Sequence, residues 1–169
     1  MASKIKPIPD GFHSITPYLI VKGAAQAIEF YQKAFGAKER FRLPGPGGKT
    51  IGHAEIQIGD SIVMLADESP QMGHHSPKSL KGTPVSLLFY VKDVDTAFER
   101  AIKAGGKVDQ PVEDKFYGER AGSIIDPFGH QWTLMTHIED VTTDEVMRRM
   151  AKFAAPAPSS KKGRKPSAK

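Results

Sequence analysis

One stretch of this chain occurs twice, and the repeat limits the folds that the rest can adopt. Residues 16–36 align with residues 86–106, and each copy predicts a strand, a short break, an amphipathic helix and a closing glycine. A long period with only two copies indicates a duplicated module rather than a solenoid of short repeats. The identical residues at matched positions are Val21/Val91, Lys22/Lys92, Ala27/Ala97, Glu29/Glu99, Lys33/Lys103, Ala34/Ala104 and Gly36/Gly106.

The segments that follow each copy extend it into a βαβββ module. Apolar residues at helical spacing predict a helix over 24–35 that ends at Gly36, and Asp93 is well placed to cap a second helix over 94–104. We expect strands at 15–21, 38–43, 50–58 and 61–66 in the first module, and at 84–91, 108–112, 122–125 and 130–137 in the second. Neither sheet can bury both faces alone. The sequence therefore predicts an α+β protein whose two βαβββ modules form a curved mixed sheet around a cavity, with the helices outside.

The remaining segments connect or flank the modules. The expected organisation is an extended lead-in (1–12), module 1 (13–68), a linker (69–83), module 2 (84–140), a C-terminal helix (141–153) and a basic disordered tail (154–169). The tail accounts for the net charge of +5, because five of the 24 basic residues lie in it and 19 acidic residues balance the other 19. We expect at most weak contact between this tail and nucleic acid or another acidic partner.

Composition and motif content exclude several kinds of chemistry. With no cysteine, the chain has no disulfides, no thiolate metal site and no cysteine nucleophile. It has no apolar run of membrane-spanning length and no signal-peptide pattern, which predicts a cytoplasmic protein without a membrane partner. Nucleophile-elbow, phosphate-loop and dinucleotide-binding motifs are also absent from the sequence.

Two motifs are similar to those of a known family. The helix 27–36 (AIEFYQKAFG) and the turn 126–130 (DPFGH), within the duplicated βαβββ order, resemble the vicinal oxygen chelate superfamily, the group of glyoxalase I, bleomycin-resistance proteins and extradiol dioxygenases. Residues 126–140, with 116–120 (FYGER) before them, are similar to its PhnB-like branch. The resemblance implies a small-molecule cavity and a homodimer, but not one activity, since such folds host many functions.

The resemblance also allows the usual metal site of the superfamily to be tested. Its metal-dependent members take His or Glu ligands from the first and last strands of each module, and the matching positions here are Thr16, Met64, Ser86 and Thr133. Hydroxyl and thioether groups are poor ligands for divalent transition metals. We therefore expect no metal or other cofactor, although a divalent metal is kept as an alternative.

His53 and Glu55 are the candidate catalytic residues. They lie two apart on an expected strand and so share a face, where they could act as an acid/base pair or give two metal ligands. The alternative is a polar pair that lines the cavity or a dimer seam. Strand alternation and the matched metal positions give the expected ligand-binding residues, together with a polar loop over 113–121 that could close over them: Tyr18, Met64, Ser86, Leu88, Tyr90, Phe116, Tyr117, Arg120 and Thr133.

Other polar and aromatic residues are interpreted as structural. Trp132 is expected to face the helices, His130 to fix the turn before the last strand, and the pair His74-His75 to lie in the linker without a specific role. Three functions stay open. The preferred one is metal-free binding or sequestration of a small molecule in the cavity between modules. The alternatives are a glyoxalase-type lyase or isomerase that uses His53 and Glu55, and a dimeric interaction subunit whose basic tail contacts an acidic partner.

Overall fold

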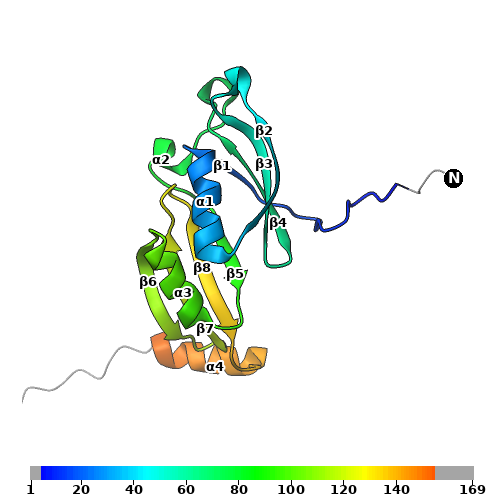
Figure 1. The fold of residues 1–169 in the computed structure, drawn as a ribbon. Coiled ribbons are helices and arrows are strands. Elements are labelled where there is room, and N and C mark those ends of the chain that lie inside the picture. Colours follow the sequence, from blue (N-terminus) through cyan, green and yellow to red (C-terminus); the bar gives the residue numbers. More distant parts are fainter. Residues whose placement is uncertain (1–4, 155–169) are drawn as a thin grey trace, which may run out of the picture.

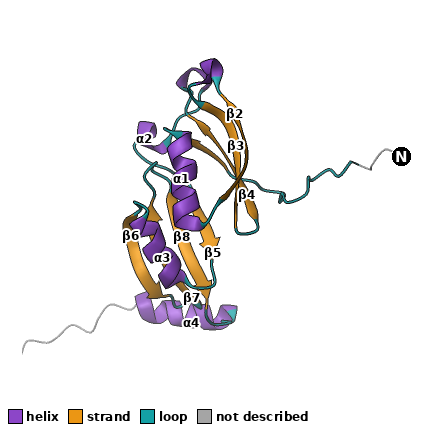
Figure 2. Cartoon of the chain, in the orientation of Figure 1, coloured by secondary structure: helices purple, strands orange, loops and turns teal. Residues whose placement is uncertain are grey.

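The computed structural model describes residues 5–154, which form two four-stranded sheets with helices packed against them (Figures 1 and 2). Sheet 1 contains β1 (Tyr18–Val21), β2 (Lys38–Pro44), β3 (Ile51–Ile58) and β4 (Ser61–Asp67), in the spatial order β1-β4-β3-β2. Sheet 2 contains β5 (Ser86–Tyr90), β6 (Lys107–Asp114), β7 (Glu119–Ile125) and β8 (Gln131–His137), in the order β5-β8-β7-β6. The helices are α1 (Ala24–Phe35), α2 (Pro77–Leu80), α3 (Val94–Lys103) and α4 (Thr143–Ala154), with 3-10 turns η1 (Pro46–Gly48) and η2 (Pro70–Met72).

The two sheets have the same topology. In each, the first strand of the module runs parallel to the last, and the other neighbours are antiparallel. The expected α+β class and the two βαβββ modules are confirmed. The strands form two separate sheets, however, rather than one continuous curved sheet, since β1 and β5 are each the edge strand of their own sheet.

Helix α1 has the expected bounds and ends as predicted. Gly36 adopts the left-handed conformation (φ 69°) in which a side chain would be strained, and its N–H donates to the last turn. The N-terminus, by contrast, has no side-chain cap of its own, because Gly23 precedes the helix. The Asp67 carboxylate at the end of β4 accepts hydrogen bonds from the N–H groups of Gly23 (2.8 Å) and Ala24 (2.9 Å) instead.

Helix α3 begins at the predicted residue and has the predicted N-cap, and it ends one residue early, at Lys103. Asp93 caps it by accepting a hydrogen bond from the N–H of Thr96 at 3.1 Å. The apolar residues Val94, Ala97, Phe98 and Ala101 are buried. Both helices thus bury one face against their own sheet, as an amphipathic pattern requires.

Helix α1 also packs against the second module. Its Tyr31 is fully buried and donates a hydrogen bond to the Asp126 carboxylate at 2.8 Å, and Phe35 contacts Trp132 with ring centroids 4.7 Å apart. From α3, the Arg100 guanidinium donates to the carbonyl of Ala34 at 2.7 Å. One core therefore contains residues of both modules.

Asp126 is the polar centre of this contact. Besides Tyr31, its carboxylate accepts hydrogen bonds from the indole N–H of Trp132 (3.0 Å) and from the backbone N–H groups of Phe128 (2.8 Å) and His130 (2.9 Å). Trp132 faces the helices and is buried, as the sequence predicted. The turn is fixed by Asp126, whereas the Nδ1 atom of His130 is buried with no hydrogen-bond partner among the described residues.

Four segments differ from the sequence expectations. Strand β1 begins at Tyr18 rather than at residue 15, and β6 and β7 extend into the expected polar loop, leaving only 115–118 as a turn.

The linker contains the short elements η2 and α2. Ser76 caps α2 by accepting a hydrogen bond from the N–H of Ser79. The Glu68 carboxylate in turn accepts hydrogen bonds from the hydroxyls of Ser76 (2.7 Å) and Ser79 (2.6 Å). Sequence periodicity cannot detect so short a helix. The expected basic tail lies outside the described residues from 155 onward.

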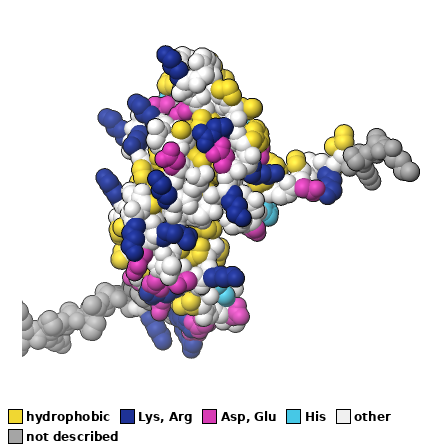
Figure 3. Space-filling view, viewed as in Figure 1, with side chains coloured by type: hydrophobic (Ala, Val, Ile, Leu, Met, Phe, Trp, Pro, Cys, Tyr) yellow, Lys and Arg dark blue, Asp and Glu magenta, His cyan; other side chains and the backbone are white. Residues whose placement is uncertain are grey.

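The surface carries charges of both signs. On the face shown in Figure 3, Lys and Arg side chains are spread over both modules and alternate with Asp and Glu. This agrees with the balanced charge expected for the body of the chain. Within residues 5–154, no helix combines the length and the apolar character needed to cross a membrane.

Candidate functional site

The face of sheet 1 that points away from α1, called here open face 1, carries four of the expected site residues: Tyr18, His53, Glu55 and Met64. The strand register places Tyr18 beside Met64, Met64 opposite Glu55, and Glu55 opposite Phe41, so that one row of side chains crosses all four strands. His53 lies two residues from Glu55 on the same face. The structure thus brings Tyr18 and Met64, which were expected to bind a ligand, next to His53 and Glu55, which were expected to be catalytic.

A chain of polar contacts runs along this row. The Tyr18 hydroxyl lies 3.0 Å from Nδ1 of His53, which is hydrogen-bond distance. His53 Nε2 is 3.8 Å from Glu55 Oε1, and Glu55 Oε2 is 3.7 Å from a guanidinium nitrogen of Arg40; both are ion-pair rather than hydrogen-bond distances. We call Tyr18, His53, Glu55 and Arg40 the polar chain.

Aromatic rings hold His53 in place. The rings of Tyr18 and Phe41 each lie 5.6 Å from the imidazole, centroid to centroid. Partial burial raises the pKa of the Tyr18 hydroxyl, so this group stays a protonated donor over the physiological range. Glu55 is only 8% exposed, whereas Tyr18 is 47% exposed. The polar chain therefore begins at an accessible phenol and leads to a shielded carboxylate, which the Arg40 guanidinium faces from the other side.

The equivalent face of sheet 2, open face 2, is less polar. The register places Leu88 beside Thr133 and Tyr90 beside Met135. Leu88, Tyr117, Thr133 and Met135 line a hollow of about 380 Å³ on this face. Leu88 and Tyr90 are 60% and 59% exposed. Burial and the nearby Glu119 carboxylate raise the pKa of Tyr90. The hollow is also lined by Gln110 and Lys115, so open face 2 combines apolar contact area with separate hydrogen-bonding groups.

Two of the expected ligand-binding residues lie apart from the open faces, and Ser86 lies on open face 2. Ser86 is an exposed residue at the start of β5, on the same side of the strand as Leu88 and Tyr90. Phe116 lies in the turn after β6 with its ring packed edge-on against Tyr117 (5.2 Å). Arg120 lies on the helix side of sheet 2, where its guanidinium donates two hydrogen bonds of 2.8 Å to Asp95 of α3 and one of 2.8 Å to Asp114. Asp95 and Asp114 hold this guanidinium away from open face 2.

The positions that correspond to metal ligands in the superfamily hold groups unsuited to a divalent transition metal. Thr16 precedes β1 and its hydroxyl donates to the carbonyl of His13 at 3.2 Å, while Met64 and Thr133 lie on different open faces. In the part of the chain that the structure describes, no three His, Cys, Asp or Glu side chains are grouped so as to hold a metal ion. The donor set present does not fit the metal that the superfamily implies.

Sequence reasoning missed two residues of open face 1 and a cluster at the edge of open face 2. Arg40 and Phe41 lie on β2, where a register shift between Glu39 and Phe41 interrupts the alternation from which a face is assigned. On β8, His137 contacts Asp140 three residues on (2.9 Å) and the Glu119 carboxylate on β7 (3.0 Å), and the contact with Glu119 joins residues too far apart in sequence for a local pattern to mark it. The face of Arg40 and Phe41 and the contact between His137 and Glu119 both follow from strand pairing, which the sequence alone does not give.

Comparisons with known proteins agree with the fold. The model of the Glyoxalase/Bleomycin resistance protein/Dioxygenase superfamily matches residues 11–134. An uncharacterized protein of Mycobacterium tuberculosis is 45% identical over 154 residues, which cover 89% of this chain and 86% of the relative. An uncharacterized protein of Arabidopsis thaliana is 30% identical over 125 residues, covering 70% of this chain and 74% of the relative.

Solved structures share the fold. TioX from Micromonospora sp. ML1 superposes with a TM-score of 0.58 at 28% identity, covering 73% of this chain and 98% of TioX. A PhnB protein from Bacillus cereus, described as a putative 3-demethylubiquinone-9 3-methyltransferase, superposes with a TM-score of 0.57 at 20% identity, covering 73% of this chain and 99% of that protein. At that identity the second likeness concerns the fold alone.

Proposed function

Because this chain belongs to the Glyoxalase/Bleomycin resistance protein/Dioxygenase superfamily, we propose that it binds a small aromatic or amphiphilic molecule without the help of a metal ion. The observation that carries the proposal is open face 1, where the accessible Tyr18–His53 pair lies among apolar side chains. Phe41 and Leu43 on the same face are 43% and 53% exposed. A ligand would bury this apolar surface and hydrogen-bond to Tyr18 or His53.

The arrangement has the usual composition of a small-molecule site. Such sites are mostly apolar, with a few placed polar groups that fix the orientation of the ligand. On open face 1, Met64, Phe41 and Leu43 supply apolar contact, and the polar chain supplies one accessible end. Arg40 offsets the charge of Glu55 within the protein, so a ligand meets the phenol and the imidazole first.

A homodimer would complete the site. The apolar residues of both open faces are exposed in the single chain, and a contiguous exposed apolar surface is typical of an interaction site. If a second copy covers these faces, the ligand would be held in a closed cavity between sheets of two chains. Size-exclusion chromatography with light scattering, over a range of concentrations, tests this part of the proposal.

Native mass spectrometry with elemental analysis of the purified protein tests the binding function directly. We expect a bound small molecule, or binding of the aromatic probe 8-anilinonaphthalene-1-sulfonate, with no stoichiometric divalent metal. Probe affinity should fall for His53→Ala and not for His137→Ala, a matched histidine outside the proposed site. A stoichiometric metal that His53→Ala removes would overturn the metal-free part.

Acid–base catalysis by a lyase or isomerase is the second candidate, and the polar chain favours it. A histidine between a phenol and a carboxylate can take a proton from a ligand, because the carboxylate stabilises the imidazolium that forms. In this scheme His53 is the base, Glu55 stabilises its charged form, and Tyr18 donates to the ligand oxygen that gains charge. Turnover of the methylglyoxal–glutathione adduct that His53→Ala abolishes would favour this candidate over binding alone.

A further inference from the structure

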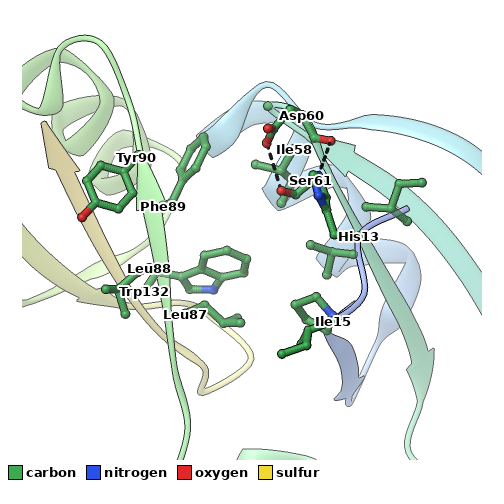
Figure 4. A pocket seen from close by; sticks show the side chains of 14 residues that line it. His13, Ile15, Ile58, Asp60, Ser61, Leu87, Leu88, Phe89, Tyr90 and Trp132 are labelled. Atoms are coloured by element: carbon green, nitrogen blue, oxygen red, sulfur yellow. Dashed lines mark hydrogen bonds between the residues drawn. The ribbon is translucent and has the colours of Figure 1, made fainter. Parts of the chain in front are cut away.

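A cleft of about 660 Å³ lies between the two modules (Figure 4); its lining includes Leu88 and Tyr90 of open face 2 but no residue of the polar chain. Its walls are the edge strand β5 of module 2 and, opposite, the β3–β4 hairpin with the segment before β1. The volume is in the range of small-molecule sites. The sequence predicted a cavity between the modules with Leu88 and Tyr90 among its ligand-binding residues, but it did not indicate the walls formed by the β3–β4 hairpin and the segment before β1.

The β5 wall is aromatic and aliphatic. Figure 4 shows Phe89 and Trp132 on this side, with Leu87 beside them. Trp132 is held in place, because its indole N–H donates to Asp126 and its ring packs against Phe35. Trp132 is only 3% exposed, so Phe89 supplies most of the aromatic surface that the cleft offers, and such a surface favours a flat, apolar ring.

The opposite wall has a polar end at the turn of the hairpin. There the Ser61 hydroxyl donates to Asp60 Oδ1 at 3.0 Å, and His13 Nε2 lies 3.4 Å from the carbonyl of Asp60 (Figure 4). Ile15 and Ile58 continue this wall as an apolar surface. The cleft thus has hydrogen-bonding groups at one end only.

The charge of the lining is one-sided. Asp60 is the one carboxylate among the residues that line the cleft, and no Lys or Arg side chain is among them. A negative charge beside aromatic rings attracts a cation through both the carboxylate and the ring faces. The same lining disfavours an anion.

We propose that this cleft is a second binding site, which takes an aromatic molecule carrying a protonated amine. The ring system lies against Phe89 and Trp132, and the ammonium group donates to Asp60 at the hairpin turn. Leu88 and Tyr90 of strand β5 border both the cleft and open face 2, and the Tyr90 ring points away from the cleft in Figure 4. The backbone of β5 therefore lies between this ligand and open face 2. The cleft site does not depend on the polar chain of open face 1.

The single tryptophan of the chain makes the test specific. Trp132 gives one indole N–H resonance in a ¹H–¹⁵N spectrum of the labelled full chain, and this residue lines the cleft. Titration with 1-naphthylmethylamine, a cation at neutral pH, should shift that resonance. Titration with 1-naphthylacetate, which has the same ring and a negative charge, should bind at least about tenfold more weakly.

Two substitutions at exposed positions locate the probe. Ile15→Asn removes apolar contact from the cleft wall and should weaken amine binding by about tenfold, whereas Ile8→Asn, in the same segment but outside the lining, should leave it unchanged. Asp60→Asn should remove the preference for the amine over the acetate.

Three outcomes would overturn the proposal. One is an indole resonance that does not move up to the solubility limit of the amine. Another is equal affinity for the two probes in the unsubstituted chain. The third is amine binding that Ile15→Asn does not affect but His53→Ala abolishes, which would place the probe on open face 1. That last result would contradict the cleft site and leave the proposed function standing.

Discussion

The two modules have the same topology, but their open faces differ in chemistry. Open face 1 has a phenol, an imidazole, a carboxylate and a guanidinium in sequence across one row of strands. At the matching row of open face 2, the residues are Leu88, Thr133, Ser123 and Gln110, a row with hydroxyl and amide groups but no imidazole or guanidinium. The β-ladders that position the side chains are alike, so the difference lies in the side chains alone.

The comparison indicates a division of roles between the modules. In a duplicated fold, each sheet supplies the same geometry of outward positions, and each copy can carry different groups there. Here one copy offers proton donors and acceptors, and the other offers apolar area with an accessible tyrosine. The predictions below test whether this division holds, from the largest expected effect to the smallest.

Loss of Asp126 should cost the most, because both open faces depend on the contact between modules. Asp126→Ala leaves four buried donors without an acceptor, among them the Tyr31 hydroxyl and the Trp132 indole. We expect a loss of about 3–5 kcal/mol in the free energy of unfolding, measured by urea denaturation. The matched control is Asp109→Ala, an exposed carboxylate that accepts from Ser123 and Gln131, with an expected loss of about 1 kcal/mol. Equal losses would contradict the central role of Asp126.

Removal of the imidazole from open face 1 should weaken ligand binding more than the same change on open face 2. His53→Ala deletes the group between Tyr18 and Glu55, and we expect the affinity for 8-anilinonaphthalene-1-sulfonate to fall by about tenfold. Fluorescence titration measures the change, with His137→Ala as the comparison. If His137→Ala has the larger effect, the assignment of roles to the two faces is reversed.

A smaller effect is expected from the loss of one hydroxyl. Tyr18→Phe keeps the ring beside His53 and removes the 3.0 Å hydrogen bond, which should cost about 0.5–1.5 kcal/mol of binding free energy to the same probe. Tyr90→Phe is the equivalent change on open face 2. The two tyrosines would have the same role if both substitutions reduced affinity equally.

The smallest effect concerns the pH dependence of stability at the edge of open face 2. Hydrogen bonds from the His137 ring to the carboxylates of Asp140 and Glu119 raise the pKa of His137 above its ordinary value of 6.5. The protonated form is thus favoured in the folded state, and its contribution is fully present below the unfolded pKa and lost as the pH rises through the folded pKa. His137→Gln should therefore lower the melting temperature slightly in mildly acidic buffer and not in alkaline buffer. His53→Gln, measured at the same two pH values, serves as the control on the other face. A loss of stability for His137→Gln that is equal in both buffers would contradict this linkage.

Much of the fold could be predicted from the sequence, because the relevant signals are local. The period of α1, the stop at Gly36 and the cap at Asp93 all depend on residues close together in the chain. The same holds for the placement of His53 and Glu55 on one face. The contacts from Asp67 to the start of α1 and from Tyr31 to Asp126 join residues that are distant in sequence, and no local pattern marks them.

The site was only partly predictable for the same reason. Tyr18, His53 and Met64 were selected separately, and the strand register brings them together. Arg120 was expected near the ligand, but its strand begins earlier than the sequence indicated and its side chain reaches Asp95 on the helix side. The placement of Arg120 depends on where strand β7 begins, and this is set by its pairing with β8.

The position of α1 has a consequence for how the protein folds. The helix belongs to the first repeat in sequence, yet its Tyr31 and Phe35 lie in a core shared with Trp132 and Phe128 of the second. A fragment cut between the repeats would expose these rings on both halves. The sequence is duplicated, but the two repeats share one core. We therefore expect the chain to unfold as a single cooperative unit, in one transition that involves both repeats.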